Sequence, residues 1–377
     1  MPVALTDLEI VRTAEALSTL QPEWDELYRR SEPRNPFLSH AWTLACLAAD
    51  QRSAKPFVVT LRDGGGLVAV APMCIETRLG FRVLRFIADD RSDYLGFLCA
   101  PQTPHLRRKL LDVLVRNSAH WDIALFQQVT DAYSELRTAV LPAGFRLHDV
   151  LWTTAPYCAS DSDWESLHLE GPSWLKRTRK RLRRFLKDGW EIERFTGSEA
   201  AARLDEVSAI EAKSWKGRQG AARLRPGSGQ NLLRRAFEHD AAGELELWLA
   251  SIDGKSVAFQ IDFLLPDRLW VYQQAYDEDF KRTSVGSFMA YLSFEAAWRA
   301  GAREYDYLSG EEPYKLERTN ASRAIHHLAA HRRTLRGWLA YGLLVGPRWR
   351  LRNVAALRGI YKSAQSLNRW LRPQAGA

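Results

Sequence analysis

The chain has 377 residues and an ordinary apolar content, so it can bury one large hydrophobic core or two of medium size. Its net charge of +8 is uneven, because twelve Lys and Arg and no Asp or Glu lie from Arg318 to Ala377, which leaves the preceding residues net acidic by four charges. Four widely separated cysteines without a C-x-x-C pair exclude a disulfide framework, and the longest apolar run of the tail, residues 338–345, is too short to span a bilayer.

The first half alternates predicted strands and helices. Helices are expected from about residue 14 to Leu27, from Ser39 onward, and over 104–118 and 130–140. The glycine run Gly64–Gly66 predicts a hairpin turn between two of the strands. The strands are expected at 8–13, 56–61, 67–75, 81–87, 121–126 and 145–152.

The second half begins with a strongly basic helix, 173–187, and a helix is also expected over 198–215. Residues 216–230 are rich in Gly, Arg and Ser and indicate a loop. A small-residue turn, Thr283–Ser287, opens a helix that ends at Gly301, and residues beyond 334 are predicted to be helical. Strands are expected at 190–195, 244–251, 255–265, 268–275, 304–308 and 322–331.

The turn at Thr283–Ser287 is the first candidate for a binding site. Ser284 fits a helix N-cap, and small residues let backbone N–H groups come close to a ligand. Together with the helix dipole these groups form an anion site, with Lys281 and Arg282 just upstream to pair with phosphate. The alternative is an ordinary helix start with two solvated cations.

The segment from Lys281 to Gly286 resembles the Q/R-x-x-G-x-G/A signature of GNAT acyltransferases. It departs twice, with Lys281 in place of Gln or Arg and Ser284 in place of the first Gly. Both departures, and the Tyr-Asp-Tyr-Leu-x-Gly-x-x-x-Tyr-Lys pattern from Tyr305 to Lys315, are similar to the tandem-GNAT (Fem-like) acetyltransferases linked to cellulose and exopolysaccharide synthesis.

The resemblance implies an α/β fold of the α+β kind, with two GNAT-like domains that each have a mixed, mostly antiparallel sheet flanked by helices. Residues 1–160 would form a degenerate domain, 161–333 the acyl-CoA-binding domain, and 334–377 a basic amphipathic helical tail. The implied co-substrate is acetyl-CoA or another acyl-CoA, and no metal is expected. The coenzyme-binding residues carried over are Tyr276, Lys281, Arg282, Ser284, Val285, Gly286, Ser287 and Lys315.

Acyl transfer also requires proton transfer, for which the acceptor must lose a proton and the departing thiolate must gain one. The resemblance suggests Tyr314 as general acid and Glu211 or Asp306 as general base. Asp262 stands in an otherwise apolar strand, where an inward carboxylate would have a raised pKa. The plain alternative for Tyr314 is a packed core tyrosine, and for Glu211 it is a surface carboxylate. For Asp306 it is a turn residue at a strand end, and for Asp262 it is an aspartate that faces solvent.

The two basic segments leave several partners open. The helix 173–187 fits a substrate-steering or structural role, and nucleic acid is not expected because no reader motif accompanies it. The cationic, Trp-bearing tail 334–377 fits an anionic membrane surface or packing on protein. No signal-peptide layout or zinc spacing is found, so we expect a cytoplasmic protein, soluble or peripheral at the inner membrane.

Three functions are therefore considered. The first is direct acyl transfer from acyl-CoA to an amine or hydroxyl of a sugar, a nucleotide sugar or a polysaccharide precursor. The second is an aminoacyl-tRNA-dependent transferase of the Fem type. The third is a non-catalytic accessory protein that docks on a membrane polysaccharide synthase through its basic tail.

Overall fold

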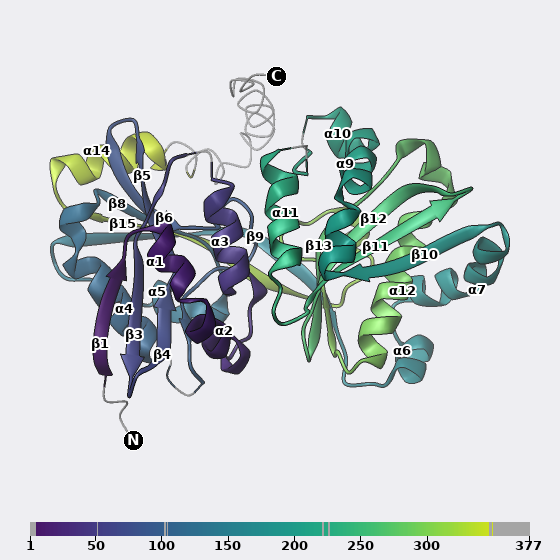
Figure 1. Cartoon of the computed structure of the whole chain (residues 1–377), viewed down its shortest axis with the longest axis horizontal. Coiled ribbons are helices and arrows are strands. Elements are labelled where there is room, and N and C mark those ends of the chain that lie inside the picture. Colours follow the sequence, from purple (N-terminus) through teal and green to yellow (C-terminus); the bar gives the residue numbers. More distant parts are fainter. Residues whose placement is uncertain are drawn as a thin grey trace.

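The computed structural model describes residues 5–346 and 349, apart from 51, 102, 104, 221, 225 and 226. Two lobes lie side by side, one formed by the first half of the chain and one by the second (Figure 1). The N-terminal lobe is defined here as β1 to α5 and the C-terminal lobe as α6 to β14. Two long strands, β9 and β15, belong to both.

The N-terminal lobe, with β9, consists of the following elements. They are β1 (Leu5–Val11), α1 (Ala14–Thr19), α2 (Gln21–Arg30), the 3-10 turn η1 (Pro36–Leu38), α3 (His40–Ala48), β2 (Lys55–Pro56), β3 (Val58–Asp63), β4 (Gly66–Ala71), β5 (Met73–Arg78), β6 (Phe81–Phe86), β7 (Leu98–Cys99), α4 (His105–Arg116), η2 (Ser118–His120), β8 (Ile123–Val129), η3 (Asp131–Tyr133), α5 (Ser134–Arg137) and β9 (Phe145–Ala159).

The remainder of the chain forms the C-terminal lobe, the second long strand and a last helix. Its elements are α6 (Trp164–Glu170), α7 (Ser173–Lys187), β10 (Trp190–Thr196), α8 (Gly197–Ala202), α9 (Leu204–Lys213), α10 (Trp215–Arg218), α11 (Ser228–Glu238), β11 (Leu245–Ile252), β12 (Lys255–Leu264), β13 (Arg268–Tyr276), η4 (Glu278–Thr283), α12 (Val285–Arg299), β14 (Glu304–Asp306), α13 (Pro313–Leu316), β15 (Ala321–Arg332) and α14 (Leu335–Leu344).

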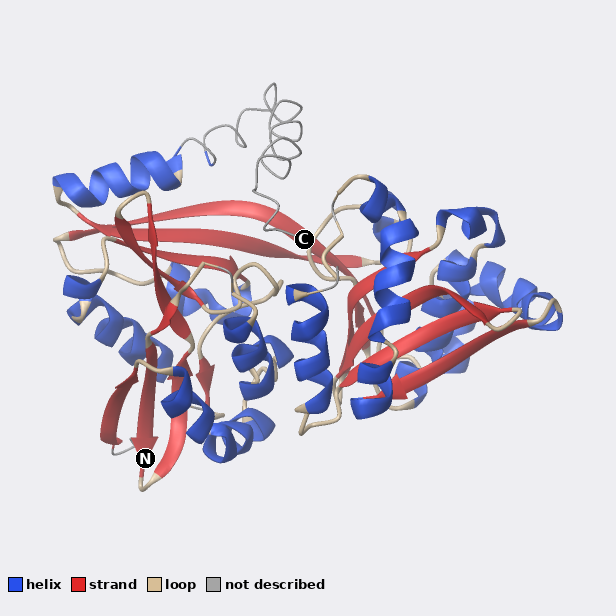
Figure 2. Ribbon diagram, turned by 45° about the horizontal axis from the view of Figure 1, so that its top comes forward, coloured by secondary structure: helices blue, strands red, loops and turns tan. Residues whose placement is uncertain are grey.

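One eleven-stranded sheet joins the lobes, in the order β10-β11-β12-β13-β14-β9-β15-β8-β6-β5-β2. Figure 2 shows its long strands running from one lobe to the other. β15 pairs antiparallel with β9 from Ala321 opposite Tyr157 to Arg332 opposite Phe145. The expected mixed, mostly antiparallel α/β fold is confirmed, but the lobes share this sheet, and a second sheet, β1-β3-β4-β7, lies in the N-terminal lobe. The expected boundary at residue 160 falls directly after β9.

The largest hydrophobic core is also continuous between the lobes. Phe37 stacks on Trp270 of β13 with ring centroids 5.6 Å apart, and Trp42 of α3 meets Tyr272 edge-on at 5.2 Å. Aromatic pairs in such geometries add about 0.5–1.5 kcal/mol each beyond the area they bury. The lobes are therefore expected to unfold together.

Two expected helices differ from the structure. The segment 130–140 contains only the turn η3 and the four-residue α5. The segment 198–215 is divided into α8 and α9 at Arg203, and α10 begins after Ser214, whose hydroxyl accepts from the Gly217 N–H at 3.3 Å. Ser214 has extended backbone and acts as an N-cap, which ends one helix and starts the next.

The start of the C-terminal tail is helical, as expected, over α14. Ala340, Val345 and Trp349 pack on Phe81 and Val83 of the N-terminal lobe, so one face of this segment covers the sheet. Residues 351–377 lie outside the described residues. No helix in the described part of the chain is long and apolar enough to cross a membrane.

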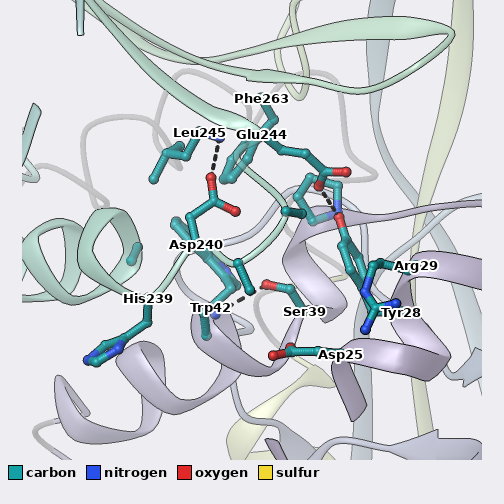
Figure 3. Close-up of a pocket in the computed structure, with 15 residues that line it drawn as sticks. Asp25, Tyr28, Arg29, Ser39, Trp42, His239, Asp240, Glu244, Leu245 and Phe263 are labelled. Carbon is teal, nitrogen blue, oxygen red and sulfur yellow. Dashed lines mark hydrogen bonds between the residues drawn. The ribbon is translucent and has the colours of Figure 1, made fainter. Parts of the chain in front are cut away.

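A polar contact next to a small cavity of about 30 Å³ ties the two lobes together. Figure 3 shows the Tyr28 hydroxyl of α2 donating to the Glu244 carboxylate, just before β11. Arg34 Nε lies 2.6 Å from the same carboxylate. Burial raises the pKa of Glu244 to about 7, although Tyr28 and Arg34 oppose the shift.

We expect Glu244→Gln to reduce the pH dependence of stability. A carboxyl whose folded pKa is raised binds its proton more tightly when folded, so stability falls as pH rises from about 4.5 to about 7. The lost increment is about 3 kcal/mol over that window. Thermal melts at pH 5 and pH 8 should show a smaller decrease in Tm for Glu244→Gln than for the wild type. The control is Glu238→Gln, an exposed change on α11. Equal decreases in Tm between pH 5 and pH 8 for the wild type and both variants would contradict the raised pKa of Glu244.

Candidate functional site

The site lies where two parallel strands diverge. β13 pairs with β14 only from Arg268 opposite Glu304 to Trp270 opposite Asp306, and β13 then continues alone on that side to Tyr276. A register shift between β12 and β13 follows Ile261 and adds local twist at the same level. The unpaired edge of β13 thus faces a gap in the sheet.

A cavity of about 690 Å³ opens at this gap. It is lined by β12 and the β13 edge, α10 and the loop after it, residues 280–289 around the start of α12, the segment 307–318 and three residues of the N-terminal lobe or β9. A cavity of this size is in the range that proteins use for small-molecule ligands. The lining residues used below are Asp93, Gln128, Trp152, Lys216, Arg223, Gln274, Tyr276, Lys281, Ser284, Val285, Gly286, Ser287, Ser309, Glu312, Tyr314, Lys315 and Arg318.

The turn before α12 has the conformation of an anion-binding helix start. Ser284 occupies the N-cap position in the left-handed region, φ 65°, and its side chain makes no capping hydrogen bond, in contrast to the N-cap role expected for it. Its carbonyl accepts from the Ser287 N–H at 2.9 Å, and Thr283 Oγ1 accepts from Val285 N–H at 3.3 Å. The first turn of α12 lines the cavity, where its positive dipole end favours a bound anion.

Arg318 is a cation that is hydrogen-bonded to the start of α12. It was not among the site residues predicted from the sequence. Its guanidinium donates to Ser287 Oγ at 2.8 Å and stacks over the ring of Trp174 with 4.9 Å between guanidinium carbon and centroid. Within the described residues it forms no ion pair with a carboxylate; its neighbours are the phenols of Tyr307 and Tyr314. A half-buried guanidinium without a carboxylate, set at a helix N-terminus, is suited to phosphate.

The expected coenzyme residues are mostly brought together. Tyr276, Lys281, Ser284, Val285, Gly286, Ser287 and Lys315 all line the cavity, whereas Arg282 does not. A Cβ on Gly286 would lie 3.6 Å from the Tyr276 ring, an ordinary van der Waals contact, so the helix start packs beside this ring. Lys315 Nζ is held by the Ser309 carbonyl at 2.8 Å and Glu312 at 3.0 Å.

Tyr314 lines the cavity, and its hydroxyl is held in place by a hydrogen bond. Gln274 Nε2, from the unpaired part of β13, donates to the Tyr314 hydroxyl at 3.0 Å. Because that contact uses a lone pair of the phenol oxygen, the phenol proton stays free to be donated. Burial raises the pKa of Tyr314, which keeps the phenol protonated.

Glu211 does not line the cavity. It is 1% exposed, and its two carboxylate oxygens accept from the backbone N–H groups of Arg223 at 3.1 Å and Leu224 at 2.6 Å. This carboxylate anchors the loop after α10. The sequence pattern identified an acidic residue near the site but not that its oxygens are occupied.

Asp306 also lies behind the cavity wall and is fully buried. The Tyr94 hydroxyl donates to it at 2.8 Å, and Arg323 Nε lies 3.3 Å away. Burial raises the pKa of Asp306 to about 6, against the opposing effect of Arg323. Asp262 is buried too, with Gln260 Nε2 donating at 2.7 Å, and burial raises its pKa as expected for an inward carboxylate.

Three cavity residues from outside the C-terminal lobe were missed by sequence reasoning as site residues. They are Asp93, Gln128 and Trp152. The sequence holds Asp93 close to Asp89 and Asp90, and nothing in this spacing shows which of the three carboxylates lines the cavity. Among the described residues no group of three or more His, Cys, Asp or Glu could hold a metal ion.

Residues 173–316 match the family model described as "Acetyltransferase (GNAT) domain". The C-terminal lobe is therefore similar to a GNAT domain over these residues. The matched segment includes β13, the turn before α12, and Tyr314, and it contains the point where β13 diverges from β14. No curated protein sequence matches the chain.

Solved structures resemble the whole chain rather than this lobe alone. A crystal structure of FemX aligns with a TM-score of 0.61 and 10% identity, covering 90% of this chain and 100% of that one. The C-terminal domain of a putative lysylphosphatidylglycerol synthetase from Agrobacterium fabrum gives 0.54 and 13%, covering 86% and 96%. L-PGS from Bacillus licheniformis gives 0.51 and 11%, covering 83% and 93%. At these identities the similarity concerns the fold alone.

Proposed function

We propose that the chain is an acyltransferase that uses acetyl-CoA or another acyl-CoA and passes the acyl group directly to an amine or hydroxyl. The observation that carries the proposal is Arg318, a guanidinium without a carboxylate partner in the described chain, bonded to Ser287 at the start of α12. The GNAT family match over 173–316 supports the same reaction class.

The chain's residues fit such a co-substrate. The first turn of α12, with Lys281 and Arg318, would hold a diphosphate, and the unpaired edge of β13 would run beside the arm that carries the thioester. The co-substrate supplies an activated acyl group. Tyr314 would donate its proton to the departing sulfur, with Gln274 fixing the orientation of the phenol.

An acceptor of the sugar, nucleotide-sugar or polysaccharide-precursor class is part of this proposal through the family resemblance. Contact of the segment 334–377 with an anionic membrane is likewise proposed. It is supported by the exposed Leu335, Trp338, Leu339 and Leu343 of α14 and by the absence of acidic residues after Glu317.

Arg318→Ala is expected to weaken coenzyme A binding about 10- to 100-fold, because it removes charge-assisted hydrogen bonds from a partly buried anion site. Isothermal titration with coenzyme A measures the affinity, and the rise in Tm with acetyl-CoA gives an independent readout. The affinity of Arg318→Lys for coenzyme A should lie between those of the wild type and Arg318→Ala. Lysine keeps the positive charge but lacks the planar guanidinium group.

Arg183→Ala, on the exposed face of α7 and outside the cavity, is the matched control and should bind coenzyme A as the wild type does. A wild-type protein that shows no thermal shift and no heat of binding at saturating acetyl-CoA would refute the proposed function. Unchanged affinity in Arg318→Ala would refute the assignment of Arg318.

A second candidate is an aminoacyl-tRNA-dependent transferase of the Fem type, and α7 is the observation that favours it. All eight Lys and Arg side chains of this helix are exposed. Arg184 lies 4.0 Å from Asp188, the one carboxylate that the structure pairs with this helix. RNA that copurifies with the protein and is lost when four of these cations are changed to Gln would favour this candidate over acyl-CoA.

A further inference from the structure

The inner wall of the cavity carries three charged side chains from both lobes that do not neutralise one another. They are Asp93, from the loop between β6 and β7, Lys216 of α10 and Arg223 of the loop that follows α10. None of the ion pairs within 4.0 Å in the described part of the chain involves any of them. Charged groups that line a concave site and form no ion pair with the protein are candidates for ligand contacts.

Lys216 is held at the free edge of β13. Its ammonium donates to the Gln274 carbonyl at 3.1 Å and to Gln273 Oε1 at 3.4 Å. Burial lowers its pKa to about 8, and the nearby Arg223 adds to the shift. A negatively charged ligand at this wall would offset the electrostatic repulsion between the two cations and would therefore bind favourably.

Asp93 lines the same cavity as these two cations. The backbone N–H of Ser309 donates to its carboxylate, and the charges of Arg223 and Lys315 act on it. Lys315 is already engaged with Glu312 at 3.0 Å, so it is not free to neutralise Asp93. Burial raises the pKa of Asp93, an environment in which a carboxylate gains from a bound ammonium group.

The loop that presents Asp93 is fixed on both sides of it. On one side, Trp42 Nε1 donates to Ser92 Oγ at 2.9 Å and the Tyr272 hydroxyl donates to the Arg91 carbonyl at 3.0 Å. On the other side, the Tyr94 hydroxyl donates to Asp306. Asp306 is therefore a positioning residue that holds the N-terminal lobe's loop against the C-terminal lobe.

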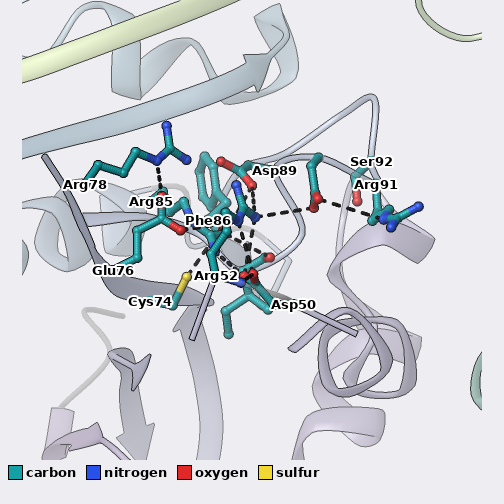
Figure 4. Close-up of polar contacts among 12 residues, drawn as sticks. Asp50, Arg52, Cys74, Glu76, Arg78, Arg85, Phe86, Asp89, Arg91 and Ser92 are labelled. Carbon is teal, nitrogen blue, oxygen red and sulfur yellow. Dashed lines mark hydrogen bonds and ion pairs between the residues drawn. The ribbon is translucent and has the colours of Figure 1, made fainter. Parts of the chain in front are cut away.

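The beginning of the same loop is anchored by an ion cluster. Figure 4 shows Arg85 among Asp50, Glu76 and Asp89, with Arg52 alongside. Arg85 Nη1 lies 3.0 Å from Asp89, and its side chain is fully buried. A loop tied down at Asp89 and at Tyr94 has little freedom, so Asp93 is pre-organised at the cavity wall.

We propose that the acceptor carries a primary amine and, next to it, an anionic group, and that it binds with the amine at Asp93 and the anionic group at Lys216 and Arg223. The proposal rests on the acyl transfer proposed above and specifies the charges of its acceptor. An amino-sugar phosphate belongs to the sugar class named there, whereas an α-amino acid would replace that class. A carboxylate and a phosphate monoester share the required charge. An α-amino acid and an amino-sugar phosphate are therefore the two sources to be distinguished.

The proton balance of the reaction follows from this placement. Asp93 takes one proton from the acceptor's ammonium group and later releases it to solvent. The nitrogen–carbon bond of the amide forms as the carbon–sulfur bond of the thioester breaks. The sulfur takes the phenol proton of Tyr314, and the second proton of the amine nitrogen restores the phenol. The products are an amide, a free thiol and one proton.

The test is an acceptor panel with acetyl-CoA, followed by release of the free thiol. The panel holds glycine, L-serine, L-lysine, L-glutamate and glucosamine 6-phosphate, and each has a matched compound without the anionic group, such as glycinamide, serinamide or glucosamine. Saturation-transfer NMR with coenzyme A present reports binding independently of turnover. We expect binding and thiol release only with compounds that carry both charges. Whether the amino acids or glucosamine 6-phosphate react faster identifies the anionic group as a carboxylate or a phosphate.

Variants assign the two halves of the site. Arg223→Ala and Lys216→Met should each raise the acceptor KM about tenfold or more while the acetyl-CoA KM is unchanged. Asp93→Asn should lower kcat about 100-fold. The matched controls are Arg218→Ala, an exposed cation of α10 outside the cavity, and Asp90→Asn in the same loop. Both controls should behave as wild type.

The outcomes distinguish failure of the acceptor proposal from failure of the proposed use of acyl-CoA. If acetyl-CoA raises Tm but no doubly charged member of the panel binds or turns over, or if the neutral counterparts react equally well, the acceptor assignment is overturned and acyl-CoA use stands. If acetyl-CoA itself does not bind, both proposals are overturned together.

Discussion

Tyr314→Phe is expected to lower kcat about 100-fold or more, with the KM for acetyl-CoA changed by less than about threefold. General-acid catalysis contributes roughly 10²–10⁴ to a rate, and phenylalanine keeps the ring while removing the proton. The 3.0 Å contact from Gln274 Nε2 holds the phenol oxygen at the unpaired edge of β13, so the loss concerns one atom. Release of the free thiol under saturating substrates measures kcat.

Tyr291→Phe is the matched control, because Tyr291 lies on α12 in a separate hydrophobic cluster and does not line the cavity. It should retain wild-type kcat. If Tyr314→Phe also stays within threefold of wild type while acetyl-CoA still binds, Tyr314 does not transfer the proton.

Arg85→Met is expected to destabilise the protein by about 3–5 kcal/mol, the usual result of removing one partner from a buried ion cluster. Arg85 is fully buried, with Nε 2.9 Å from Glu76 and Nη1 3.0 Å from Asp89, and it also contacts Asp50 (Figure 4). Its loss leaves three buried carboxylates with only the partly exposed Arg52 and, at Glu76, Arg78 to compensate them. Urea unfolding followed by circular dichroism gives the free energy of unfolding.

Arg78→Met is the control for the cluster. Arg78 pairs with the same Glu76 but its side chain is 30% exposed, so its loss should cost less than about 1 kcal/mol. Adding Asp50→Asn and Glu76→Gln to Arg85→Met should restore part of the stability, because the buried charges are removed with their partner. Equal free energies of unfolding for Arg85→Met and Arg78→Met would contradict the role of burial.

Much of the fold was predicted from the sequence because the signals are local. The alternation of apolar residues located β11, β12 and β13 to within a residue or two, and the amphipathic pattern of residues 173–187 is α7. The small residues before Val285 predicted the turn and the start of α12. These elements depend on residues within a few positions of one another, so a single sequence is sufficient.

Long-range pairing was decided by the tertiary structure. β9 was expected to end at 152 and extends to Ala159, because β15 and β14 supply partners for its second half. The shared sheet that joins the lobes follows from this pairing. A single strand's pattern does not show which distant strand will pair with it, since many strands have the same alternation.

The candidate site divides in the same way. The sequence by itself determined the helix start at Val285–Ser287 and the tyrosine at 314, because both belong to one short pattern. Only the tertiary structure decided that Glu211 and Asp306 hold loops, and that Arg318 and Asp93 face the cavity. The physical reason is that a carboxylate acts according to which donors already occupy its oxygens and whether it faces a cavity. Partners more than a hundred positions away contribute to both residues: Tyr94 donates to Asp306, beside the local Leu308 N–H, and Arg223 and Ser309 act on Asp93.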